Sequence, residues 1–123
     1  MSAMPGIADF DSKAAGRRIN DENRLEDERI ERRRIAARAE AGRLADAMRA
    51  TDPGVKAIRG FGSTFEDGRP YRMDSDIDIA IEGGDLLSLE KIADASCFKV
   101  DLVDISDCDD GFSRMIKESG TSL

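Results

Sequence analysis

Acidic and apolar side chains alternate in one short segment, where Asp76 and Asp78 flank Ile77 and Ile79 follows. Alternation along a β-strand places the two carboxylates on one face and the two isoleucines on the other. Adjacent carboxylates repel each other unless a cation neutralises them, and Mg²⁺ binds one or two carboxylates together with phosphate oxygens. The pair therefore predicts a magnesium site.

Two further features are predicted to lie at the same place. Asp101 falls within another apolar segment and supplies a third carboxylate if the two strands are neighbours. Gly62-Ser63 ends an earlier apolar segment, and a glycine followed by a hydroxyl lets phosphate oxygens approach the backbone amides. Ser63 also suits the N-cap of a helix, a role that uses the same amides. Each feature alone is weak, but together they predict a site for a nucleoside triphosphate and a divalent metal.

The composition excludes several other chemistries. The chain contains no histidine, which removes Ser-His and Cys-His nucleophile pairs and the usual general base. Cys97 and Cys108 lack the spacing of a metal site and are predicted to be buried or idle thiols. The net charge is −7 and the acidic excess lies in residues 51–123, which disfavours binding of long DNA or RNA. Chemistry must therefore come from carboxylates, hydroxyls, backbone amides and metal.

The elements that would position these residues follow from periodicity. Alternation and β-branched content predict three strands, and helical spacing predicts two helices between and after them. The expected fold class is α/β (α+β), a small mixed sheet of about three to four strands backed by helices. The predicted strands are 55–61, 76–82 and 99–105, and the predicted helices are 84–95 and 109–119, the latter interrupted early by Gly111.

One long helix is predicted ahead of this core. Residues 1–19 show no period and are predicted to form a disordered tail, whereas residues 20–50 begin with a capping-type sequence and are rich in helix formers. Asp52-Pro53-Gly54 is predicted to stop the helix. Its apolar stripe suits packing on a sheet and consists of Ile30, Ala37, Ala41, Leu44 and Met48. Residues 20–123 are thus predicted to be a single domain with its core at 55–123.

Arginines cluster in the middle of the long helix, at positions 32–34. A solvated helix face is favoured over a docking surface for an acidic partner.

No apolar run is long enough to cross a bilayer, and the N-terminus lacks the apolar stretch of a secretory signal. The sequence predicts a cytoplasmic protein with no membrane partner.

The segment GFGSTFEDGRPYRMDSDIDIAIEGG followed by FKVDLVDI resembles the minimal nucleotidyltransferases of the DNA polymerase β superfamily. Their signature is Gly-Ser, then Asp-x-Asp, then a third acidic residue on a later strand. The resemblance covers roughly residues 50–123 and implies the nucleotidyltransferase fold. It also implies triphosphate binding by Gly62 and Ser63, and two Mg²⁺ ions held by Asp76, Asp78 and Asp101, the last helping to activate the attacking hydroxyl.

The resemblance implies an enzyme and a partner. The expected reaction is transfer of a nucleoside monophosphate, AMP from ATP, to an acceptor hydroxyl. Minimal nucleotidyltransferases are often encoded with a HEPN-domain ribonuclease toxin and act as its antitoxin. The resemblance therefore implies a HEPN-type partner and a homo- or hetero-oligomer. Two alternatives stay open: a non-catalytic binding module with the same fold, and, less favoured without a second domain, nucleotide transfer to a small molecule.

The segment after Ser63 departs from the family pattern. Twelve residues separate Ser63 from Asp76, a couple more than usual, and Phe65-Glu66-Asp67-Gly68 replaces the usual Ala-Arg-Gly. The acidic pair would repel a triphosphate unless Arg69 or Arg72 turns inward. A reshaped loop is therefore expected. Two further aspartates are left out of the metal site: Asp74 is predicted to cap a turn, and Asp104 is predicted to face solvent or to cap a helix.

Overall fold

The long helix is longer than the sequence pattern predicts. The computed structural model describes the backbone of residues 3–123 and the side chains of residues 20–123, and helix α1 runs over Ala3–Thr51. The predicted start at Asn20 is therefore wrong, because residues 3–19, predicted to be a disordered tail, continue the helix. The segment contains Pro5, Gly6 and Gly16, which are poor helix formers, so the sequence alone did not indicate a helix there. The C-terminal end at Thr51 agrees with the predicted stop.

The chain divides into two compact units, residues 1–32 and residues 33–123. The first unit is the N-terminal part of α1, in which Arg24 pairs with Asp21 and Arg32 donates a hydrogen bond to the backbone oxygen of Glu28. The second contains the rest of α1 and all other elements. No helix of the described chain is long and apolar enough to span a membrane.

Four strands form one mixed sheet in the order β3-β2-β1-β4. Strands β1 (Val55–Phe61) and β2 (Ile77–Gly83) are antiparallel, and β2 is parallel to β3 (Val100–Asp104). The predicted mixed sheet is thus confirmed. The short strand β4 (Thr121–Ser122) was not predicted, because two residues carry no alternation to detect.

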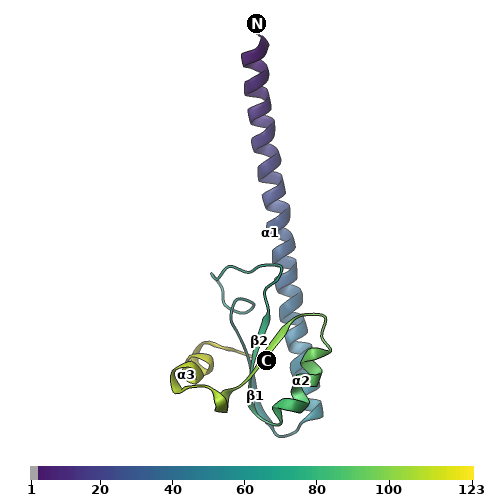
Figure 1. Cartoon of the computed structure of the whole chain (residues 1–123), viewed down its shortest axis with the longest axis vertical. Helices are drawn as coiled ribbons and strands as arrows, with labels where there is room; N and C mark the ends of the chain where they lie inside the picture. Colours follow the sequence, from purple (N-terminus) through teal and green to yellow (C-terminus); the bar gives the residue numbers. More distant parts are fainter. Residues whose placement is uncertain (1–2) are drawn as a thin grey trace. The chain divides into compact units, whose positions relative to one another are not determined.

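Helices cover both faces of the sheet. Figure 1 shows the strands between α3 (Asp110–Ser119) on one side and α2 (Leu86–Asp94) with the C-terminal part of α1 on the other. A 3₁₀ turn, η1 (Ile105–Asp107), links β3 to α3. The predicted interruption at Gly111 is wrong, because α3 continues through it after the Asp109 carboxylate accepts the backbone N–H of Phe112 at 2.7 Å. A glycine in a capped first turn costs little helix stability.

The core lies mainly between β2 and the C-terminal part of α1. Ile77, Ile79 and Ile81 on alternate positions of β2 are almost completely buried, as predicted by their spacing. The stripe on α1 is confirmed at its four positions within the second unit, and Ala45 joins it. The fully buried residues of that stripe are Ala37, Ala41, Leu44, Ala45 and Met48. A second, smaller cluster on the α3 side contains Ala80, Ile105 and Ile116.

Leu44→Ala should lower the free energy of unfolding by roughly 2–5 kcal/mol, because it removes a fully buried side chain and leaves a cavity. The matched control is Leu87→Ala, since Leu87 is 71% exposed and its truncation should change stability by less than about 0.5 kcal/mol. Urea unfolding monitored by circular dichroism gives both values. Equal effects of the two changes would contradict the assigned core.

Candidate functional site

The strand register brings two of the predicted carboxylates together. Asp78 on β2 is directly paired with Asp101 on β3, and side chains at paired positions of parallel strands project from the same face. Asp78 is half-buried and Asp101 is exposed. The face that they share is also the face of Ala80, which packs against Ile116 of α3. A carboxylate pair therefore lies on the α3 side of the sheet.

The third predicted carboxylate has a different immediate partner. Asp76 precedes β2, and its Oδ2 lies 3.6 Å from the Nζ of Lys99. Among residues 20–123, no group of three His, Cys, Asp or Glu side chains is arranged to hold a metal ion. The donor chemistry of Asp78 and Asp101 nevertheless suits Mg²⁺, which prefers carboxylate oxygens. Assignment of these three residues as metal ligands stays a prediction.

Asp78 is electrostatically the most perturbed of the three. Its pKa is raised to about 6, mainly by burial and in addition by the neighbouring negative charges of Asp101 and Asp76. Arg69 acts in the opposite direction and lowers the pKa. A carboxyl group with this pKa is charged at neutral pH only at a cost in free energy. A divalent cation at this position would remove that cost.

Folding stability should therefore depend on the ionisation of Asp78. Because its folded pKa of about 6 exceeds its ordinary value, protonated Asp78 favours the folded state, and this contribution is lost as pH rises from about 4 through 6. We expect Asp78→Asn to be more stable than the parent at pH 7.5 by roughly 1–2 kcal/mol, a value discounted for partial exposure, and to lose the advantage at pH 4. Urea unfolding without metal at both pH values measures it. A pH-independent difference would contradict this account.

Gly62 lies directly against Asp78. It has a positive φ of 75°, and a Cβ built on it would lie 2.3 Å from the Oδ2 of Asp78. Its carbonyl accepts the backbone N–H groups of Phe65 and Glu66, which closes a tight turn around Ser63. No α-helix begins directly after Ser63, so its predicted N-cap role is wrong. The structure thus brings Gly62, and Ser63 next to it in the chain, to the carboxylate pair.

The acidic loop after Ser63 is neutralised within the fold. The Oε2 of Glu66 lies 3.1 Å from a guanidinium nitrogen of Arg69, whose side chain is exposed, so this pair offsets the charge of Glu66 at the surface. The buried Thr64 donates a hydrogen bond from its hydroxyl to the backbone oxygen of Asp76 at 3.0 Å. This bond ties the start of the loop to the residue just before β2.

The arginine cluster is not the solvated face that the sequence favoured. The guanidinium of Arg33 lies 3.9 Å above the ring centroid of Phe98, and Arg34 binds the loop that follows Ser63. Only Arg32 of the three is exposed. Arg38, which the sequence analysis missed, binds the same loop. Its signal was its position one turn after Arg34, beside the buried Ala37 and Ala41.

Other predicted roles are structural. Asp104 accepts the backbone N–H of Ser106 at 2.9 Å, so its predicted capping role is confirmed at η1. Cys97 and Cys108 are free thiols.

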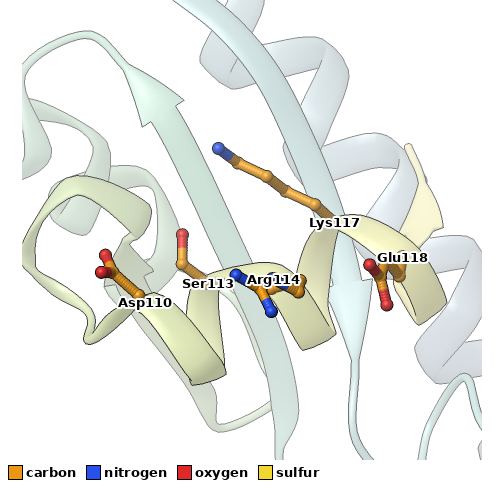
Figure 2. Close-up of a pocket in the computed structure, with 5 residues that line it drawn as sticks. All are labelled: Asp110, Ser113, Arg114, Lys117 and Glu118. Atoms are coloured by element: carbon orange, nitrogen blue, oxygen red, sulfur yellow. The ribbon is translucent and has the colours of Figure 1, made fainter.

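A separate surface hollow of about 380 Å³ lies along α3 (Figure 2). Its lining contains side chains of both charge signs: Asp110, Ser113, Arg114, Lys117 and Glu118. None of the five predicted site residues lines this hollow.

Comparisons with known proteins identify the fold through solved structures. No protein-family model matches this chain, and no curated protein is significantly similar to it. A crystal structure of a toxin–antitoxin with AMP-PNP matches with a TM-score of 0.54 and 26% identity, over 67% of this chain and 70% of that one.

Two MntA structures match as well. A mutant of the toxin–antitoxin MntA–HpeT, with Asp-to-Glu changes at two alternate positions, matches with a TM-score of 0.52 and 25% identity, over 67% of this chain and 70% of that one. The MntA–HepT toxin–antitoxin matches with a TM-score of 0.50 and 24% identity, over 69% of each chain. The chain therefore has the nucleotidyltransferase fold of the MntA structures.

Proposed function

We propose that this chain is a metal-dependent nucleotidyltransferase that transfers a nucleoside monophosphate, AMP from ATP, to a hydroxyl group of a partner protein. The observation that carries the proposal is the pairing of Asp78 with Asp101 across β2 and β3, with Gly62 against Asp78. On a nucleotidyltransferase fold, this arrangement supplies carboxylates for metal and, beside them, a Gly-Ser turn for phosphate.

The similar structures support the same proposal from another direction. One contains AMP-PNP, which is an analogue of ATP, and another is a mutant at two alternate aspartates, the spacing of Asp76 and Asp78 here. They are toxin–antitoxin assemblies. We therefore propose that this chain is the antitoxin of such a pair and that a HEPN-type toxin is the acceptor.

The proposed reaction assigns each residue a task. Asp78 and Asp101 would hold Mg²⁺, with Asp76 joining them when Lys99 moves away, and the metal would neutralise the triphosphate and acidify the acceptor hydroxyl. Gly62 and Ser63 would bind the triphosphate. Asp101 would take the hydroxyl proton while the acceptor oxygen bonds to the α-phosphorus and the bond to pyrophosphate breaks.

A second candidate is a non-catalytic binding module with the same fold. Two observations favour it: Asp76 is already paired with Lys99, and among the side chains described no three acidic groups are arranged to hold a metal. Such a module would neutralise its toxin by binding alone. Its activity would survive the loss of the carboxylates.

Calorimetric titration with ATP, GTP, CTP and UTP, with and without MgCl₂, tests the proposal. Mg²⁺-dependent binding of ATP that Asp78→Asn abolishes and Glu82→Gln preserves would support it, since Glu82 lies on the same strand but pairs with Arg59. In a second assay, a HEPN-domain ribonuclease is incubated with α-labelled ATP. Absent labelling, together with toxin neutralisation by the double variant Asp76→Asn/Asp78→Asn, would establish the binding module instead.

A further inference from the structure

Two arginines of α1 bind the backbone of the loop that follows Gly62-Ser63. The Nε of Arg38 donates to the backbone oxygen of Thr64 at 2.7 Å. The Nη2 of Arg38 donates to the backbone oxygen of Phe65 at 3.3 Å. The Nη2 of Arg34 donates to the backbone oxygen of Glu66 at 2.9 Å. The Nε of Arg34 donates to the backbone oxygen of Thr64 at 3.4 Å. Three consecutive carbonyl groups are thus held by two guanidinium groups.

The same two guanidinium groups also form ion pairs with Asp67 of the loop. One carboxylate oxygen of Asp67 lies 3.1 Å from Arg34 and 3.4 Å from Arg38. The Arg34 side chain is only 14% exposed, so its hydrogen bonds are shielded from water, whereas Asp67 is 93% exposed and adds little by itself. The Arg38 side chain is 41% exposed, so the strongest of these contacts are those of Arg34 to the carbonyl groups.

The helix provides a rigid support for these contacts. Ala37 and Ala41 are fully buried on the same part of α1, so the arginine stems start from a fixed backbone. A guanidinium group presents several N–H donors in one plane, a geometry that an ammonium group does not reproduce. The carbonyl groups are consequently fixed in direction as well as in position.

We propose that Arg34 and Arg38 are positioning residues that hold the loop after Gly62-Ser63 in the shape that receives a triphosphate. They add to the hydrogen bonds within the loop, whose sequence Phe65-Glu66-Asp67-Gly68 departs from the usual pattern. Both arginines would act through the backbone of the loop and not by contact with the nucleotide. The inference rests on the proposed function, because it assigns the loop's task to nucleotide binding.

The test uses the full chain with Arg34→Lys and Arg38→Lys combined, which keeps both charges and removes both planar donor groups. Hydrogen exchange of residues 62–68 without nucleotide should accelerate by roughly tenfold or more, and the Kd for Mg²⁺-ATP should rise by a similar factor. The control is Arg32→Lys, because Arg32 bonds only to its own helix. Exchange in β1 and β2 should stay unchanged in both variants.

The outcomes separate the two proposals. Unchanged exchange in residues 62–68 would overturn the positioning role, whatever happens to nucleotide binding. Faster exchange with an unchanged Kd would also overturn it, because the arginines would then have only a structural role. A parent protein that binds no nucleotide would refute the proposed function and with it the task assigned to the loop, while the exchange data would still show whether the arginines order it.

Discussion

Asp78→Asn is expected to reduce nucleotidyl transfer on the order of a thousandfold, the largest effect of any single change in this chain. The substitution keeps the size of the side chain but removes the negative charge that would bind the metal between Asp78 and the paired Asp101. Pyrophosphate release from ATP in the presence of the acceptor toxin measures the rate. The effect on kcat/KM should be largest above pH 6, where Asp78 of the parent is charged, and should shrink at lower pH as this carboxyl group is protonated.

The control for this prediction is Glu82→Gln, which also neutralises a carboxylate on β2 but one that pairs with Arg59. It should retain the parent's transfer rate within a small factor. Asp78→Asn should raise stability while it lowers activity. It removes the free-energy cost of burying a charged carboxylate and the repulsion between like charges, both of which raise the pKa of Asp78. A variant that loses both activity and stability would indicate misfolding and contradict the proposed role.

Gly62→Ala is expected to weaken Mg²⁺-ATP binding by at least roughly tenfold and to lower the free energy of unfolding by about 1–3 kcal/mol. The new Cβ would lie 2.3 Å from the Oδ2 of Asp78, so either the carboxylate or the turn around Ser63 must move. The positive φ of 75° adds backbone strain. Calorimetric titration and urea unfolding measure the two effects.

Gly68→Ala separates strain from steric conflict. Gly68 has a similar φ of 82°, but a Cβ built on it meets nothing within 4 Å. Its replacement should cost about 1 kcal/mol from strain alone and leave nucleotide affinity nearly unchanged. If both glycine variants bound ATP equally well, the close approach of Gly62 to Asp78 would have no part in the site.

Local periodicity in the sequence determined most of the elements. The strand predicted at 55–61 is observed as Val55–Phe61, and the apolar positions of β2 and of the second half of α1 are buried as their spacing predicts. These properties depend on which side chains share a face, and neighbours in the sequence settle that. The helical extension to Ala3 was missed, because the segment before Asn20 contains Pro5, Gly6 and Gly16, which are poor helix formers.

The tertiary structure alone decided how the candidate site is assembled. The sequence placed Asp76 and Asp78 near each other but could not give the register that pairs Asp78 with Asp101, nor the ion pair of Asp76 with Lys99. It also could not show that Arg34 reaches a loop some thirty positions away. Such contacts join segments that are distant along the chain, and they are set by strand register and helix packing, which leave no periodic trace in a single sequence.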